Sequence, residues 1–176
     1  MSSTISLLSS GARVVVTTHA ADGTSIFHSD QVLEPFSPFG PSGSSFTIFD
    51  ARPSVPVDNL AAPAAADLRK TLPRVPATGV NFCITNIAPR YSVPMHRTLS
   101  LDYAIVLAGE IVLALDGGDE KTVRAGEFIV QQGVNHAWHN RTDDVCRIAF
   151  VGVGSEKIRL ASGEELGETV IKGPGK

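Results

Sequence analysis

Two short groups of residues, each containing a histidine, constrain the fold of this chain more than any other feature. The first group contains His96 and Thr98, and the second contains His136. His96 and Thr98 are separated by one residue, so on a β-strand their side chains would point to the same face. His136 can join them only if the fold brings a second strand alongside the first. The spacing therefore predicts a small β-barrel with a cluster of polar side chains inside it.

Further residues at fixed intervals frame both groups. The first half-motif contains Pro94, His96, Thr98, Asp102 and Gly109, and the second contains Gly126, His136 and Asn140. This arrangement resembles the two motifs of the cupin family. The resemblance covers residues 80–153, and the segments 100–103 and 132–138 are similar to those of small single-domain cupins. It implies an all-β fold, the double-stranded β-helix or jelly roll of the cupin barrel.

The two half-motifs depart from the usual cupin pattern at several positions. Thr98 stands where cupins usually have a second histidine, and Asp102 stands where they usually have a glutamate. Two of the four habitual metal ligands are therefore altered. The second half-motif lacks its usual proline, with Gln131, Gln132 and Gly133 around that place, and is one residue shorter before His136. These departures concern the chemistry of the site rather than the fold.

Length, composition and charge narrow the class of protein. A chain of 176 residues with 43% apolar content can form one compact domain with a core of its own. Lys and Arg are scattered and the net charge is −3, so the basic surface of a nucleic-acid-binding protein is missing. Residues 1–10 contain no cationic side chain and only a short apolar stretch, which fits neither a secretory signal nor a membrane span. We expect a cytoplasmic protein with no nucleic-acid or membrane partner.

Cys83 and Cys146 lie in strand-like runs and show no close CxxC spacing. With no secretory context, the sequence predicts two buried, reduced thiols rather than a disulfide or a redox pair.

The first part of the chain is predicted to form an N-terminal β-hairpin and a long excursion. Two β-branched or apolar runs, 14–18 and 25–28, flank the turn residues Asp22-Gly23. A loop over 35–44 and a short strand over 45–49 follow. Residues 51–78 are rich in Pro and Ala, and only Ala64–Leu72 favours a short helix.

From residue 80 the pattern becomes a succession of short strands separated by turn residues, which is typical of a β-sandwich or barrel. We predict strands at 80–87, 101–108, 110–116, 121–124, 128–132, 136–140 and 145–153. The predicted organisation is an N-terminal extension packed on the barrel (1–79), the cupin barrel core (80–153) and a C-terminal tail (154–176).

Residues 103–115 are apolar on both alternating faces apart from Gly109 and Glu110. Such strands have no face suited to solvent, so the N-terminal segment or another subunit should cover the outer side. We expect a homodimer.

The chemistry of the cluster leaves three hypotheses open. In the first, His96, Asp102 and His136 bind a divalent transition metal such as Fe, Mn, Ni, Co or Zn and leave coordination positions for substrate. The carboxylate is the weak point of this set, because Asp is one methylene shorter than Glu. Thr98 is a poor replacement ligand, because a neutral hydroxyl binds a divalent ion much less strongly than imidazole.

In the second hypothesis the pocket holds no metal. His96 and His136 then act as hydrogen-bonding or acid and base groups in apolar surroundings, and Thr98 and Asp102 orient them. The third hypothesis makes all four residues structural. Trp138 has the same strand parity as His136, so it either lines the pocket or fills the core.

The resemblance to cupins implies a small-molecule substrate or ligand but no particular reaction, because one fold hosts many activities. We expect an enzyme, a lyase or isomerase, that acts on a small carbonyl or carboxylate compound of secondary metabolism. The reaction would be decarboxylation, isomerisation or dehydration by proton transfer, with a metal as Lewis acid if one is bound. The alternatives are a small-molecule-binding protein without turnover and a metal-dependent dioxygenase, which would need iron with open coordination positions.

Overall fold

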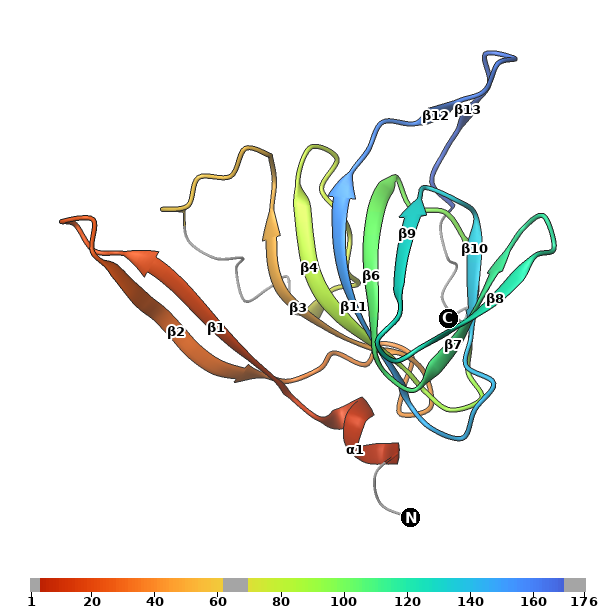
Figure 1. The fold of residues 1–176 in the computed structure, drawn as a ribbon, viewed down its shortest axis with the longest axis horizontal. Helices are drawn as coiled ribbons and strands as arrows, with labels where there is room; N and C mark the ends of the chain where they lie inside the picture. Colours follow the sequence, from red (N-terminus) through yellow and green to blue (C-terminus); the bar gives the residue numbers. More distant parts are fainter. Residues whose placement is uncertain (1–3, 62–69, 170–176) are drawn as a thin grey trace.

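Two antiparallel sheets face each other and enclose the core of the protein (Figure 1). The computed structural model describes residues 4–61 and 70–169. The four-stranded sheet has the order β5 (Ser92–His96), β10 (His136–His139), β7 (Glu110–Leu115) and β8 (Glu120–Arg124). The five-stranded sheet has the order β3 (Ser45–Arg52), β4 (Val80–Ile87), β11 (Cys146–Gly154), β6 (Ser100–Ala108) and β9 (Phe128–Gln132). The fold is the all-β jelly roll that the sequence predicted.

The apolar core lies between the two sheets. On β6 the side chains alternate, so that Ala104 and Val106 are buried inside while Ile105 is exposed outside. The core consists of Ile87, Ala104, Val106, Ile111, Val123, Trp138, Cys146 and Ile148. Cys83 and Cys146 are buried free thiols, as predicted, and burial raises the pKa of each to about 12.

Most predicted barrel strands match the structure to within one or two residues, but β5 was not predicted. Pro94 lies inside β5, and a proline within a run argues against a central strand because it donates no hydrogen bond. The structure resolves the conflict by placing β5 at the edge of its sheet, beside β10 alone. Because β5 ends at His96, Thr98 lies in the following loop and not on the same strand.

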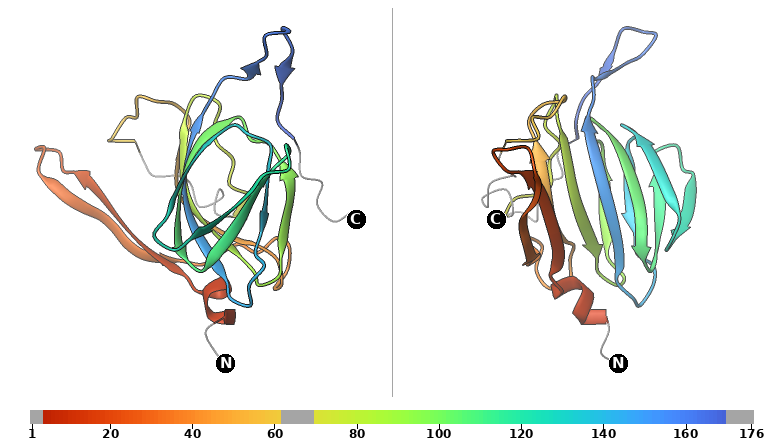
Figure 2. Two further views of the ribbon diagram at one scale, coloured as in Figure 1. Left: turned by 45° about the vertical axis from the view of Figure 1, so that its right-hand side comes forward. Right: turned by 60° about the vertical axis from the view of Figure 1, so that its left-hand side comes forward.

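The N-terminal part differs from its predicted arrangement in two ways. β3 is the edge strand of the larger sheet, so the barrel includes residues before 80. The predicted hairpin is present as β1 (Ala12–His19) and β2 (Ser25–Leu33), but it projects away from the barrel instead of packing along it (Figures 1 and 2).

A short helix, α1 (Thr4–Ser9), precedes the hairpin and is held to the larger sheet by polar side chains. Arg147 donates a hydrogen bond from Nη2 to the carbonyl oxygen of Leu7 (3.0 Å), and Ser45 Oγ donates to that of Leu8 (2.9 Å). These bonds satisfy carbonyl groups that a helix end leaves without intrahelical partners. Asn86 joins the two side chains, since it accepts from Arg147 Nε and donates to Ser45 Oγ.

The described segments around residue 70 and after β11 contribute no strand to the two large sheets. The helix expected over Ala64–Leu72 falls mostly outside the described residues, and 70–72 are not α-helical. The C-terminal part forms a small projecting hairpin, β12 (Ile158–Arg159) with β13 (Glu165–Leu166) (Figure 1). None of the helices in 4–61 and 70–169 has the length and apolar character needed to span a membrane.

Asn140 fixes the turn between β10 and β11. Its buried side chain donates to the carbonyl oxygens of Ile87 (3.0 Å) and Asp144 (2.7 Å). Its Oδ1 accepts from the backbone and hydroxyl of Thr142. This asparagine therefore has a structural role next to the cluster.

Gly109, between β6 and β7, should be intolerant of any side chain. Its φ is +74°, and a Cβ there would lie 2.8 Å from the carbonyl oxygen of Val145. We expect Gly109→Ala to lower the free energy of unfolding by about 2–4 kcal/mol, measured by urea denaturation. Gly117→Ala is the control, because a Cβ at Gly117 meets nothing within 4 Å. Equal stability of the two variants would contradict this account of the turn.

Candidate functional site

His96 and His136 lie side by side at one end of the four-stranded sheet. They are directly opposed residues on β5 and β10, and their ring centroids are 4.2 Å apart. His136 is only 2% exposed, whereas His96 is partly exposed. Cross-strand pairing thus brings together the two histidines that the half-motifs singled out.

Backbone carbonyl groups set the protonation pattern of both rings. Nδ1 of His96 lies 2.8 Å from the carbonyl oxygen of Pro94, and Nδ1 of His136 lies 3.0 Å from that of Val134. Because a carbonyl oxygen only accepts, each Nδ1 carries the hydrogen. In the neutral rings, Nε2 therefore has the lone pair.

Gln131 connects His136 to Asp102 on the opposite sheet. Its side-chain nitrogen lies 3.1 Å from Asp102 Oδ2 and 3.3 Å from His136 Nε2, and both of these atoms accept. The amide group therefore donates one hydrogen to each. Its oxygen, Oε1, is buried and has no hydrogen-bond partner among the described residues. An acceptor left in this state costs about 1–3 kcal/mol unless a ligand or water fills it.

Asp102 and Gln131 belong to a polar row that crosses the inner face of the larger sheet. The row runs through neighbouring strands as Asn81, Gly152, Asp102 and Gln131. A Cβ at Gly152 would lie 2.7 Å from Asn81 Oδ1 and 2.9 Å from Asp102 Oδ1. The missing side chain at Gly152 thus leaves the space in which these two side chains sit.

Burial dominates the electrostatics of the cluster. It lowers the pKa of His136 to about 4, helped by the nearby His96, and it lowers the pKa of His96 less strongly because the Pro94 carbonyl and Asp102 oppose it. Burial also raises the pKa of Asp102, against hydrogen bonds from Ser100, Gln131 and Thr98. Both imidazoles are therefore neutral near pH 7 and able to accept a proton.

The donor set does not fit a three-ligand metal site as it stands. Within 4–61 and 70–169, no three His, Cys, Asp or Glu side chains form a group that could hold a metal ion. The predicted set of His96, Asp102 and His136 is thus not assembled for coordination. The reason is visible at Gln131, whose amide donates to His136 Nε2 and to Asp102 Oδ2, the atoms that would face a metal.

The remaining predicted residues lie beside this cluster. Thr98 Oγ1 is 3.4 Å from Asp102 Oδ2 and accepts a hydrogen bond from Ser100 Oγ at 2.9 Å. Trp138 is buried, packs edge-on against His136 at a centroid distance of 5.4 Å, and also contacts Phe150 in the core. It therefore forms both a wall of the site and part of the core.

The sequence analysis missed the roles of Gln131, Ser100 and Asn81. Gln131 had a usable signal, because Ile129 is apolar and the strand period of two places residue 131 on the same inner face. Asn81 and Ser100 occupy strand ends, where alternation gives a weaker indication. Their contacts depend on the register between strands, which no single segment reveals.

Comparison with known proteins identifies a domain within the barrel. A sequence model of the cupin domain family matches residues 83–152. The chain therefore contains a cupin domain in this segment, which is less than half of its length. Among solved structures, an oxalate oxidase in complex with the substrate analogue glycolate shares 19% identity with a TM-score of 0.45, over 68% of this chain and 55% of that one.

The relatives found by sequence include a biosynthesis-cluster protein and an oxidoreductase. Phomopsin biosynthesis cluster protein C′ of Diaporthe leptostromiformis is 40% identical over 85 residues, which cover 48% of this chain and 44% of that protein. The cupin-domain-containing oxidoreductase fogC of Aspergillus ruber is 29% identical over 134 residues, 74% of this chain and 66% of that protein. The matches thus span less than half of the first relative and about two thirds of the second.

The neutral state of His136 should make the protein less stable in acid. An unfolded histidine has a pKa of about 6.5, so between there and about 4 the unfolded chain binds a proton that the folded site excludes. The free energy of unfolding should therefore fall as the pH falls through this window, by about 3 kcal/mol from His136.

Urea unfolding at several pH values, compared between wild type and His136→Gln, isolates this contribution. The comparison is needed because the raised pKa of Asp102 acts in the opposite direction. His139→Gln is the matched control, since His139 is more exposed and bonds Ser92 outside the cluster. A pH dependence that is identical in wild type and His136→Gln would refute the burial argument.

Proposed function

We propose that this cupin is an enzyme that moves a proton within a small carbonyl or carboxylate compound, without a metal, and so isomerises or dehydrates it. The observation that carries the proposal is the pair of neutral imidazoles whose Nδ1 atoms are held by backbone carbonyl groups. Such a pair presents lone pairs rather than charges, in surroundings that exclude most water. The biosynthesis-cluster context of relatives supports a substrate from secondary metabolism.

His96 is the general base in this proposal. It is the more accessible of the two rings, and the described residues offer its Nε2 no hydrogen bond, whereas His136 Nε2 already accepts from Gln131. Asp102 stabilises the imidazolium that forms on His96, since its negative charge raises the pKa of His96. Gln131, which also donates to His136, holds Asp102 in place.

The proton transfer balances within the substrate. His96 Nε2 takes a proton from the carbon next to the carbonyl group, and the C–H electron pair forms the enolate. Return of the proton to another carbon gives the isomer, and its delivery to a hydroxyl group that leaves as water gives the dehydrated product. A substrate hydroxyl can donate to Gln131 Oε1, the buried acceptor without a partner. Decarboxylation would instead release CO₂, and the resulting enolate would take a proton that His96 Nε2 relays from solvent.

The test is turnover of a panel of small keto and hydroxy acids by wild type and variants. We expect His96→Gln to lower kcat/KM by about 10²–10⁴-fold, the usual contribution of a general base, and Asp102→Asn to lower it less. Activity should also fall in acid as His96 becomes protonated, at a pH below its ordinary pKa of 6.5. His139→Gln should be as active as wild type. Full activity of His96→Gln would remove the base from the mechanism, and saturable binding without turnover by any variant would favour a binding protein.

A metal-dependent oxidoreductase, such as a dioxygenase, is the second candidate, favoured by the name of the relative from Aspergillus ruber. The chain offers a gain-of-function test of its metal chemistry. Thr98→His would supply an imidazole near Asp102 and restore the histidine that cupins usually have at this position. We expect this variant to bind Zn²⁺ at least about tenfold more tightly than wild type by titration calorimetry.

Thr122→His is the control for added imidazole, because Thr122 is exposed on β8, away from the cluster. Elemental analysis of wild type purified without a His-tag belongs to the same experiment. One tightly bound metal ion per wild-type chain would contradict the metal-free proposal and favour the oxidoreductase.

A further inference from the structure

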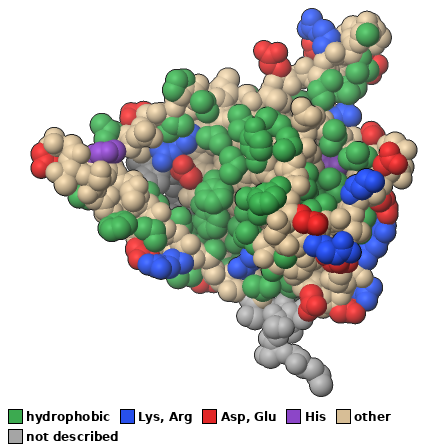
Figure 3. Space-filling view, viewed as in Figure 1, with side chains coloured by type: hydrophobic (Ala, Val, Ile, Leu, Met, Phe, Trp, Pro, Cys, Tyr) green, Lys and Arg blue, Asp and Glu red, His purple; other side chains and the backbone are tan. Residues whose placement is uncertain are grey.

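The outer face of the larger sheet carries an apolar patch that nothing in the described chain covers. Figure 3 shows hydrophobic side chains gathered over the front of this sheet. The patch consists of Phe82, Tyr103, Ile105, Leu107, Phe128, Val130 and Val151, all substantially exposed. It comes from β4, β11, β6 and β9, so it is continuous across four adjacent strands. Its exposed area is on the order of 600 Å², at the upper end for a monomeric protein.

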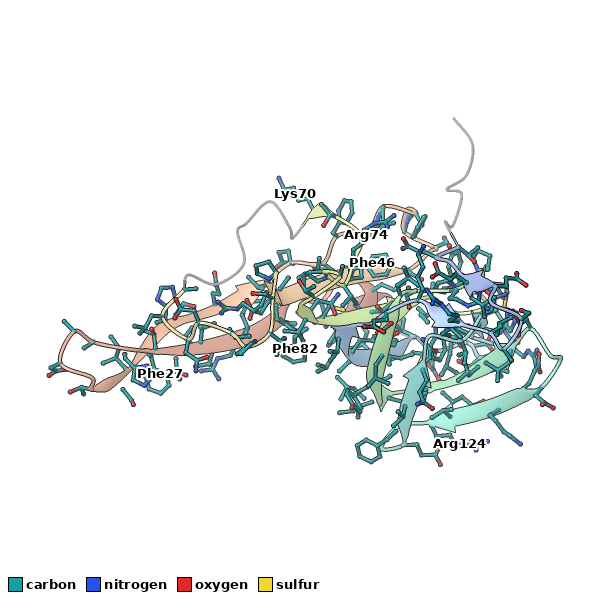
Figure 4. All side chains as sticks on the ribbon, turned by 90° about the horizontal axis from the view of Figure 1, so that it is seen from above. Phe27, Phe46, Lys70, Arg74, Phe82 and Arg124 are labelled. Carbon is teal, nitrogen blue, oxygen red and sulfur yellow. The ribbon has the colours of Figure 1, made fainter. Side chains whose placement is uncertain are left out.

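The β1–β2 hairpin is a second uncovered apolar surface. Its register places Val15, Phe27 and Val32 on one face, together with the ion pair of Arg13 with Asp30, and the three apolar side chains are exposed, Phe27 by 76%. Figure 4 shows Phe27 far out on the hairpin and Phe82 on the barrel sheet. A two-stranded hairpin with no layer packed on it is marginally stable in water. The apolar side chains on this face of the hairpin, which we call the arm, therefore lack a packing partner within the described chain.

We propose that two copies of the chain form a two-fold dimer in which each hairpin packs on the apolar patch of the other copy. The hairpin projects away from its own barrel, so its own patch stays uncovered (Figure 2). In a two-fold dimer each copy supplies one arm and one patch. Two equivalent contacts, each between the arm of one copy and the patch of the other, then bury both surfaces of both copies.

The areas agree with this arrangement. The three exposed hairpin side chains add about 300 Å² to the patch, which gives about 900 Å² of apolar surface per copy. A standard stable interface buries about 800 Å² per partner. Because little more than half of a typical interface is apolar, the apolar surface of arm and patch is enough for a stable dimer.

The first experiment is light scattering after size-exclusion chromatography at micromolar concentration. The wild type should have twice the chain mass of 18.6 kDa. Phe27→Asp on the arm and Phe128→Asp on the patch should each raise the dimer dissociation constant by about tenfold or more. Both positions are highly exposed, at 76% and 74%, so neither change should disturb folding. Leu60→Asp, at an exposed apolar residue outside both surfaces, should leave the dimer intact.

Mixing the two variants tests the exchange itself. A heterodimer of Phe27→Asp with Phe128→Asp has one contact in which an unchanged arm meets an unchanged patch, whereas each homodimer has none. The mixture should therefore form more dimer than either variant alone at the same total concentration. A monomeric wild type, an undisturbed Phe27→Asp dimer, or a mixture no more dimeric than its components would each overturn the proposal.

Discussion

The side-chain amide of Gln131 is the interaction on which the rest of the site depends. It donates to Asp102 on the neighbouring strand of the larger sheet and to His136 on the smaller one, and so joins the two walls of the barrel. It also determines which polar atoms of the cluster already have a hydrogen-bond partner. His136 Nε2 and Asp102 Oδ2 are engaged, while His96 Nε2 and Gln131 Oε1 are left for a ligand.

This bridge explains why a cupin barrel can present paired histidines without assembling a ligand set for a metal. Two imidazoles alone make a poor site for a divalent ion, and the third ligand would have to come from a carboxylate that Gln131, Thr98 and Ser100 already bind. The same bonds hold Asp102 close to His96. The altered half-motif is thus consistent with proton transfer, for which neutral imidazoles and a nearby carboxylate suffice.

The barrel and its histidine pair could be predicted from sequence, because strand alternation and turn residues are local signals. The place of Asp102 in the cluster also followed from its position in the motif. β5 was missed because Pro94 argues against a strand unless the strand lies at an edge, which is a property of the whole sheet. The Gln131 bridge depends on the register of β6 with β9 and on the approach of β10, and neither is encoded within one segment.

The central claim concerns the state of the two imidazoles, and ¹⁵N NMR of the histidine rings tests it most directly. Signals can be assigned with His96→Gln and His136→Gln. We predict that near pH 7 both rings are neutral, with hydrogen on Nδ1 and a lone pair on Nε2, because carbonyl groups face both Nδ1 atoms. An imidazolium at either position, or hydrogen on Nε2 of His96, would contradict the account.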